Sequence, residues 1–402
     1  MAPIPRLRAY EGPALLSYGF RPFFLLAALQ AGLAILVWLP FVTGHLAVPT
    51  AFAPVDWHVH EMLFGYQAAA IAGFLLTAIP NWTGRLPVQG VPLLVLVLAW
   101  LAGRLAVTAS AVIGWPLAMA GDTLFLLLLA GAAAREIVAG RNWRNLTVVA
   151  LVMLLLAANL AFHLEAGLTG SAELSRRAAI AVVLMLVALI AGRIVPSFTR
   201  NWLAPRGAGR LPAPFGSYDK LVLAATAPAL GLWIALPDTQ AAGAALALGA
   251  GLHLARLARW AGERCWRNPL LVILHVGYLF VPVGFALTAA ASFGLVAPGA
   301  GLHAWTAGAF GTMTLAVMSR ASLGHTGRPL VATMATQAAY VLLVIGAVAR
   351  ICSALGHGPT LLLHLAGLCW SLGFLVFALA YWRVLTGARL GPKAVSGAPQ
   401  PA

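Results

Sequence analysis

Charged residues are scarce in this chain of 402 residues, at 9% of the total, and only 10 residues are acidic. Cysteine occurs three times, at Cys265, Cys352 and Cys369, without any CxxC spacing. This scarcity excludes a disulfide framework. We expect the three cysteine side chains to be buried in the apolar core, and the alternative is that one of them binds copper as a thiolate. No small-residue cleavage site follows the first apolar run, so we expect the first helix to be retained.

Long apolar runs make up most of the chain, in which 61% of residues are hydrophobic and the mean hydropathy is +0.91. One soluble core cannot hide that much apolar surface, so we expect lipid to be the solvent. Each run is close to the ~20 residues that cross ~30 Å of hydrocarbon. The sequence therefore predicts an all-α polytopic membrane protein with twelve spans, at about 23–43, 58–79, 91–110, 112–137, 146–167, 178–203, 218–236, 239–258, 270–290, 302–320, 333–354 and 361–387.

Basic residues give the chain a net charge of +15, and their placement follows the predicted spans. With the N-terminus in the cytoplasm, most Lys and Arg fall in cytoplasmic segments, and only Arg176, Arg177 and Arg350 face outside. This is the positive-inside pattern, so the charge records topology and gives no indication of a nucleic-acid partner. We expect both termini in the cytoplasm and the lipid bilayer as the surrounding partner.

The chain shows no soluble domain. We expect one transmembrane domain over residues 1–390 and a disordered tail over residues 391–402. A weak internal repeat is present, because the triplet "TGR" follows His60 and His303 at the same distance, and "PSFT" at 196–199 echoes "PNWT" at 80–83. These matches favour three sets of four helices, with chance similarity as the alternative.

The stretch "WHVHEMLFGYQ", residues 57–67, places His58, His60 and Glu61 at the mouth of an apolar span. Polar side chains at membrane depth are costly and need a partner or a function. Residues two apart on a helix differ by ~200°. Either His60 alone faces the interior, or a frayed helix start capped by Asp56 presents both rings. We expect at least one ring to bind a metal; Glu61 either balances the bound cation or reaches water.

Other ionisable side chains fall into an outer and an inner layer. His303 lies at the outer depth of His58 and His60. His253 and His275 share a depth near the inner face, where they form either a metal or haem site or a plain helix–helix hydrogen bond. Three arginines beside the inner layer are candidates for binding a cofactor: Arg193, Arg200 and Arg256. His325, in an inner loop, is a candidate metal ligand. Arg104 and Asp122 are expected to form a buried ion pair.

Five long motifs occur in order between residue 17 and about residue 330. They are "SYGFRPFFLLAAL", "WHVHEMLFGYQAAAIAGFLLTAIPNWTGR", "GRIVPSFTRNWL", "LHLARLARWAGERCWRNPLLVILHVGY" and "HAWTAGAFGTMTLAVMSRASLGHTGR". Together they resemble the NnrS family of bacterial membrane proteins. The resemblance implies a twelve-helix inner-membrane protein that contains haem and copper and is associated with denitrification, nitric oxide and nitrosative stress.

The leading hypothesis is therefore a protein of nitric oxide metabolism or nitrosative-stress defence that binds b-type haem and copper, with nitric oxide as a ligand. His58, His60, Glu61 and His303 form the outer candidate site, and His253 and His275 form the inner one. Whether nitric oxide is turned over, sensed or bound stays open, as does enzyme activity. The alternatives are a secondary transporter and a membrane quinol or nitric oxide oxidoreductase that takes electrons from quinol or another donor.

Overall fold

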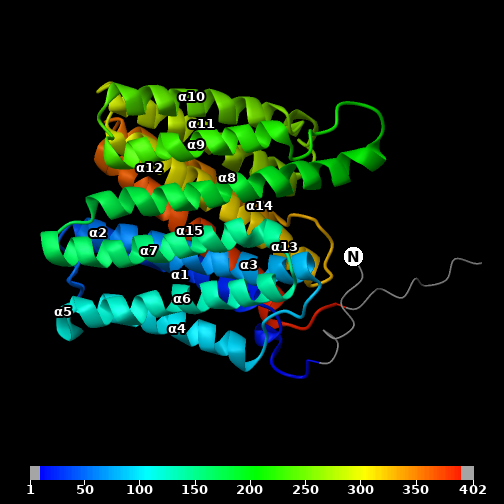
Figure 1. Ribbon diagram of the computed structural model, residues 1–402, viewed down its shortest axis with the longest axis horizontal. Coiled ribbons are helices and arrows are strands. Elements are labelled where there is room, and N and C mark those ends of the chain that lie inside the picture. Colours follow the sequence, from blue (N-terminus) through cyan, green and yellow to red (C-terminus); the bar gives the residue numbers. More distant parts are fainter. Residues whose placement is uncertain (1–9, 391–402) are drawn as a thin grey trace, which may run out of the picture.

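The structure is a computed structural model that describes residues 10–390, which form helices joined by short connections (Figure 1). The long helices are α1 (Phe20–Val42), α4 (Val91–Thr108), α6 (Trp115–Ala139), α7 (Leu146–Thr169), α8 (Glu173–Leu203), α9 (Ser217–Ala235), α10 (Gln240–Ala258), α11 (Pro269–Ser292), α14 (Met334–Ala354) and α15 (Pro359–Thr386). Two more rods are composite. They are α2 (Pro54–His60), η3 (Glu61–Gln67) and α3 (Ala68–Thr83), and α12 (Pro298–His303), η7 (Ala304–Gly311) and α13 (Thr312–His325).

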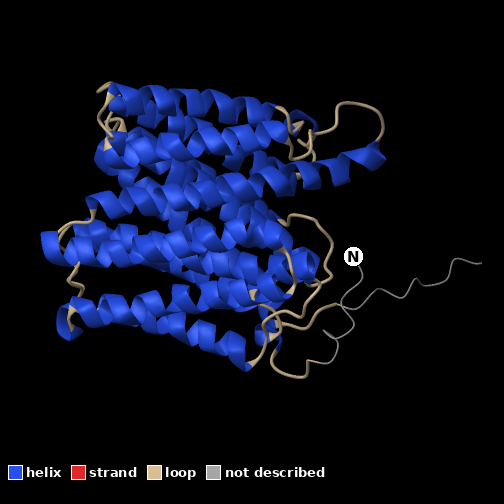
Figure 2. Cartoon of the chain, in the orientation of Figure 1, coloured by secondary structure: helices blue, strands red, loops and turns tan. Residues whose placement is uncertain are grey.

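The all-α prediction is confirmed, because the described residues contain helices and no strand, as Figure 2 shows. Every predicted span coincides with one of these rods, and ten of them are long and apolar enough to cross a bilayer. The other two are more polar. Helix α9 carries Asp219 and Lys220 in its first turn, and the rod α12–η7–α13 carries Arg320. The tail at residues 391–402 lies outside the described residues.

The helices run along a common direction and pack mainly against their neighbours in sequence (Figure 1). Helices α4 and α6 contact each other, α9 packs on α10, and α14 packs on α15. Long-range packing closes the bundle, because α1 lies against α15. Side chains such as Leu105 and Leu379 are more than two-thirds exposed on the outer surface, as expected where helices face lipid rather than water.

Three rods meet at the centre of the bundle, and they are the second helices of the three predicted sets of four. Helix α8 contacts both η3 and η7, and α13 contacts α3. The segments η3 and η7 are both π-helical, and each begins directly after a histidine, His60 or His303. Since π-helical turns are rare and concentrate at functional sites, their matched position supports the repeat and directs attention to these two histidines.

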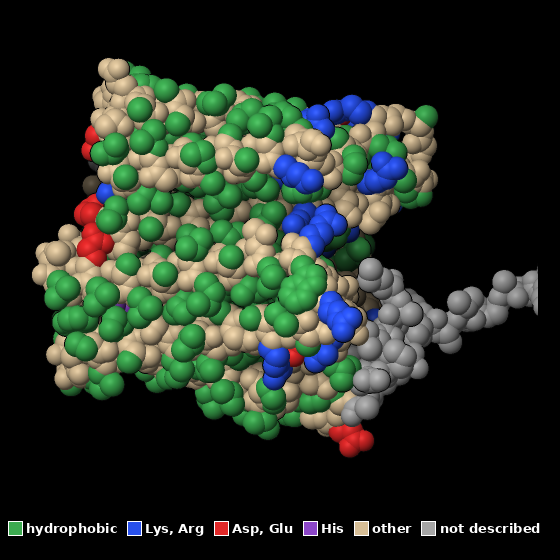
Figure 3. Space-filling view, in the orientation of Figure 1, with side chains coloured by type: hydrophobic (Ala, Val, Ile, Leu, Met, Phe, Trp, Pro, Cys, Tyr) green, Lys and Arg blue, Asp and Glu red, His purple; other side chains and the backbone are tan. Residues whose placement is uncertain are grey.

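Basic side chains gather at one end of the molecule. Figure 3 shows most of the visible Lys and Arg side chains toward one end of the molecule, and several acidic side chains at the opposite end. This separation fits the topology predicted from the positive-inside pattern. We call the basic end the inner end and the opposite one the outer end.

Candidate metal and cofactor sites

Helix α2 directs two histidines into two different sites. The helix begins at Pro54 with Ala53 as its N-cap, so the prediction of Asp56 as cap is wrong, and Asp56 lies buried within the first turn. Residues 58 and 60 are therefore already helical, and their side chains diverge by ~200°. Each of the two rings has its own interior site, an arrangement that neither sequence-based alternative described.

The first site is a fully buried cluster, defined here as His60, Glu61, Arg104, Asp122, Asn159 and His163. The Nε2 atoms of His60 and His163 lie 3.1 Å and 3.2 Å from the same carboxylate oxygen of Asp122. One ligand atom from each of these three residues falls within 4.8 Å of the others. Two imidazoles and a carboxylate are a donor set for iron, copper or zinc, so the geometry of the buried cluster suits a metal ion.

Arg104 joins the two carboxylates of the buried cluster, which confirms the predicted ion pair with Asp122 and adds Glu61 to it. Its guanidinium donates to Glu61 Oε1 at 2.6 Å and to Asp122 Oδ1. With both carboxylates ionised, one arginine leaves one negative charge uncompensated. A buried charge is expensive unless it is paired, so the buried cluster is balanced by a proton on a carboxyl group, by a proton on histidine or by a metal ion.

His60 has an acceptor oxygen at each ring nitrogen. Its Nδ1 lies 3.4 Å from Glu61 Oε1, and its Nε2 lies 3.1 Å from Asp122 Oδ2 and 3.2 Å from Asn159 Oδ1. A doubly protonated ring donates on both sides and is then the balancing cation, whereas a metal ion between Nε2 and Asp122 would take the place of the Nε2 proton. A carboxylate behind the ring is the usual way to orient a histidine toward a metal. The rings of Phe52, Phe64 and Phe162 surround the imidazole and exclude water from the site.

Glycine makes room for the buried cluster. A Cβ at Gly65 would lie 2.9 Å from a guanidinium nitrogen of Arg104 and 3.0 Å from Glu61 Oε2. Gly103 is similarly confined, because its Cβ would lie 3.0 Å from the Asp122 backbone. The indole of Trp100 donates to the Gly65 carbonyl at 3.0 Å and fixes η3 against α4.

We expect Gly65→Ala to lower the free energy of unfolding by about 1–3 kcal/mol, because the added methyl group displaces the side chains of a close-packed ion-pair network. The control is Gly131→Ala on α6, where a Cβ meets nothing within 4 Å. There alanine is expected to be neutral or stabilising by up to about 1 kcal/mol. Titration with sodium dodecyl sulfate in mixed micelles, followed by tryptophan fluorescence, measures both; equal stabilities would contradict the packing argument.

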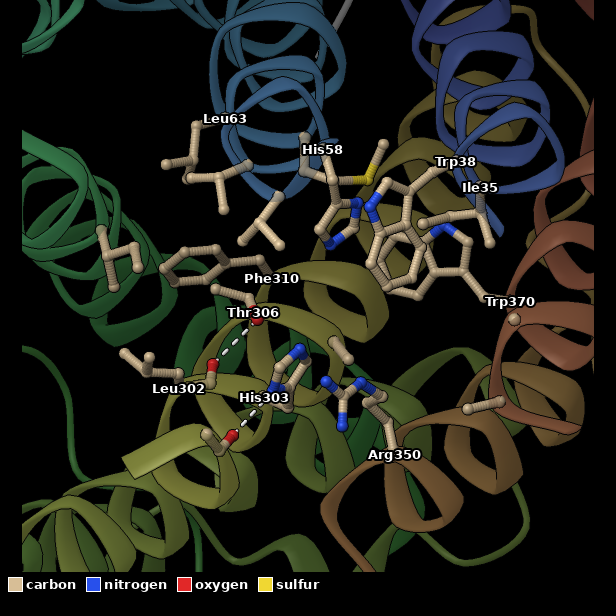
Figure 4. Close-up of a pocket in the computed structure, with 18 of the residues that line it drawn as sticks. Ile35, Trp38, His58, Leu63, Leu302, His303, Thr306, Phe310, Arg350 and Trp370 are labelled. Carbon is tan, nitrogen blue, oxygen red and sulfur yellow. Dashed lines mark hydrogen bonds between the residues drawn. The ribbon is translucent and has the colours of Figure 1, made fainter. Parts of the chain in front are cut away.

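The second site is the outer cavity, a space of about 410 Å³ lined by His58, His303 and Arg350 (Figure 4). Trp38, Trp370 and Phe310 are among its apolar walls. The ring of His58 stacks on Trp38 with centroids 4.2 Å apart. The volume lies within the ~300–1,000 Å³ typical of cofactor pockets. Two imidazoles from separate rods therefore face one largely apolar space.

Each of the two imidazoles of the outer cavity has a ring nitrogen that can bind a metal. His303 Nδ1 lies 2.7 Å from the carbonyl oxygen of Gly299 and donates to it, which leaves Nε2 as a lone pair. His58 Nδ1 is buried and has no hydrogen-bond partner in the described part of the chain. A backbone carbonyl behind a histidine is a common support for a metal-ligating ring. The residues of the outer cavity thus fit a haem held by two histidines.

The structure does not bring the predicted inner pair together. His253 has both ring nitrogens occupied, by Tyr278 at 2.8 Å and Thr226 at 3.0 Å, and stacks on Phe285. His275 Nε2 lies 3.1 Å from the hydroxyl of Thr199. Within residues 10–390, no hydrogen bond or ring contact joins the two histidines. A haem shared by them stays a prediction. The observed hydrogen bonds correspond to the alternative interpretation, in which these histidines form ordinary hydrogen bonds between helices.

The three candidate arginines lie in different surroundings. Arg256 is buried and donates to Asp219 at 2.8 Å and to Tyr278 at 2.9 Å, so it is committed to an internal ion pair. Arg200 is exposed on α8. Arg193 lines a separate cavity at the inner end.

His325 lines the same inner-end cavity and takes part in no hydrogen bond within the described residues. Its ring lies against those of Tyr18 and Phe20, with centroids 5.7 Å away in each case. Its role as a metal ligand stays a prediction.

The comparison with known protein families decides the family. A family profile described as NnrS protein matches residues 14–389, almost the whole chain. The chain belongs to the NnrS family. The match extends beyond the five sequence motifs and includes α14 and α15. These helices contribute Arg350 and Trp370 to the outer cavity. No curated protein matches the chain significantly.

Sequence reasoning missed that His163 and Asp122 complete the buried cluster. Asn159 and His163 lie four residues apart on α7, hence on one helix face, and both bond Asp122 Oδ2, the asparagine at 2.8 Å. Two polar residues at this spacing within an apolar span of an NnrS protein were the available signal.

Proposed function

We propose that this NnrS family member binds haem and copper in the inner membrane and acts in nitric oxide metabolism or nitrosative-stress defence. The proposal rests on the divergence of His58 and His60 from one helix turn. His58 faces the outer cavity with His303, and His60 faces the buried cluster with Asp122 and His163. One short motif thereby supplies a ligand to each of two sites.

The outer cavity is the proposed haem site, where His58 and His303 would hold the iron. Its apolar walls suit the macrocycle. Arg350 carries no salt bridge within the described residues and faces the cavity, where it can bind a propionate by a charge-assisted hydrogen bond (Figure 4). A haem held by both histidines would supply one-electron transfer, and release of one histidine would supply a site for nitric oxide.

The buried cluster is the proposed copper site. Asp122, His60 and His163 provide one oxygen and two nitrogen donors, a set that divalent copper accepts. The chain's own contribution is fixed orientation, because Glu61 and Asn159 hold the donors in place. A bound cation would also supply the positive charge that a proton otherwise provides in the buried cluster.

Optical spectroscopy and metal analysis of the purified protein test the proposal. We expect a Soret band, and copper at close to one ion per chain, because each proposed site takes one cofactor. A shift of the Soret band when nitric oxide is added to the reduced protein would show that nitric oxide displaces one of the two histidines. Colourless protein that holds no copper after growth with both metals would refute the proposal.

One observation favours the transporter alternative. The outer cavity shares Gln67 with a narrow middle cavity, and the middle cavity shares Phe74 and Ile194 with the cavity at the inner end. The three cavities follow the central rods from one end of the molecule to the other. Such a route is what alternating access requires. A colourless protein that accumulates a solute in vesicles would establish this alternative.

A further inference from the structure

The inner cavity lies at the inner ends of α1, α3, α8 and α13 and is completed by Arg389, which follows α15. Its volume is about 890 Å³, compared with about 410 Å³ for the outer cavity. Neither proposed metal site uses it. A space of this size suits a ligand as large as a typical cofactor.

Positive charge lines the inner cavity without compensation. Its described lining residues include Arg21, Arg193, Arg320 and Arg389 and contain no Asp or Glu. Within residues 10–390, no carboxylate lies within salt-bridge distance of these four. Burial raises the pKa of the Tyr18 phenol to about 12, so this wall residue stays neutral and supplies no phenolate. Arg193 lies within α8 and Arg320 within α13, where a charged side chain is costly without a partner, which indicates that an anion belongs between them.

Two of the arginines have donors to spare. Arg21 is committed, because its guanidinium donates to the carbonyls of Leu385 at 2.8 Å and Gly387 at 2.7 Å. Arg193 donates to Asn145 at 2.9 Å, but its Nε is buried and has no hydrogen-bond partner among residues 10–390. Arg320 lies over the ring of Phe198 at 4.3 Å and makes no hydrogen bond within the described residues. Planar guanidinium groups held in this way are suited to carboxylate or phosphate oxygens.

The other end of the inner cavity is apolar. It shares five residues with the middle cavity, which continues toward the bilayer centre: Phe24, Phe74, Ile190, Ile194 and Val317. The middle cavity is lined almost entirely by apolar atoms and has a volume of about 80 Å³. A small inorganic anion would leave this apolar part unfilled, whereas a longer molecule would occupy both parts.

We propose that the inner cavity binds an amphipathic oxyanion, whose carboxylate or phosphate group lies between Arg193 and Arg320 and whose apolar body points toward the bilayer centre. A lipid headgroup and the propionates of a haem share this chemistry. The inference goes beyond the proposed function, since it depends on neither the outer cavity nor the buried cluster.

Binding of 11-(dansylamino)undecanoic acid to the purified protein in maltoside detergent tests the inference, with the methyl ester of the same probe as the uncharged comparison. We expect wild type to bind the carboxylate more tightly than the ester. Arg320→Gln should weaken carboxylate binding by about tenfold, the effect of one charge-assisted hydrogen bond, and leave ester binding unchanged. The matched control is Arg383→Gln, since Arg383 is exposed on α15 outside the inner cavity and should bind like wild type.

Arg193→Gln provides a second test if Arg320→Gln fails to fold, and it should show the same selective loss. Displacement of the probe by phosphatidylglycerol or by haemin identifies which source of the oxyanion the inner cavity prefers, and either supports the inference. Equal affinity for carboxylate and ester in wild type, or unchanged carboxylate affinity in the folded variants, would show the inference to be wrong. If inorganic phosphate displaces the probe as effectively as phosphatidylglycerol and haemin do, the ligand needs no apolar body, and that part of the inference is wrong.

Discussion

Replacement of His58 or His303 by alanine is expected to remove most of the haem from the folded protein, while copper content stays close to that of wild type. Both imidazoles face the outer cavity, and His303 is held by the Gly299 carbonyl at 2.7 Å. Loss of a contact that only supports a ligand lowers affinity by about tenfold. Each histidine would bond directly to the iron, so its loss should lower the affinity for haem by at least as much. Pyridine haemochrome spectra and metal analysis, each per mole of protein, measure the two contents.

His60→Ala should give the opposite result, because its ring belongs to the buried cluster: copper falls and haem remains. His364→Ala is the matched control, since His364 is exposed on α15 and should change neither content. Equal loss of haem in the His58 and His60 variants would contradict two separate sites. Retention of haem in both His58→Ala and His303→Ala would exclude the outer cavity as its site, and His253→Ala and His275→Ala would then test the inner pair predicted from depth.

Much of the fold follows from the sequence because the solvent is lipid. A bilayer requires apolar runs of a set length and satisfied backbone groups, so composition alone predicts helices and their approximate number. The ends were harder to place. The span predicted to begin at residue 58 begins at Pro54, because a polar first turn with Asp56 can be buried against other helices.

The sites could be predicted only in part, because depth is encoded in the sequence but rotation about the helix axis is not. Depth correctly placed His58, His60 and His303 near one end of the bundle. It could not show that His60 turns toward α6 and α7 while His58 turns toward α12. For His253 and His275, matched depth on adjacent helices did not bring the rings together, because each points to a different hydroxyl.

Replacement of Arg104 by methionine should destabilise the protein by about 3–5 kcal/mol, because Glu61 and Asp122 would be left as buried carboxylates without their shared cation. The control is Arg85→Met. Arg85 is 44% exposed, and its partner Glu136 keeps a second arginine, Arg135, at 2.9 Å. Because Arg85 is exposed and Glu136 keeps Arg135, loss of this pair should cost about 0–1 kcal/mol, as for surface ion pairs. Titration with sodium dodecyl sulfate in mixed micelles compares the two, and a similar small loss in both would show that the buried carboxylates are not ionised.

The same variant separates a metal from a proton as the cation that balances the buried cluster. A divalent ion on His60, Asp122 and His163 would supply charge where Arg104→Met has removed it. Added Zn²⁺, which is redox-inert and accepts these donors, should therefore restore part of the lost stability in proportion to its binding. The restoration should disappear in Arg104→Met combined with His163→Ala, because that change removes a ligand. If Zn²⁺ stabilises both variants equally, the buried cluster is an ion-pair network completed by a histidine proton and is not a metal site.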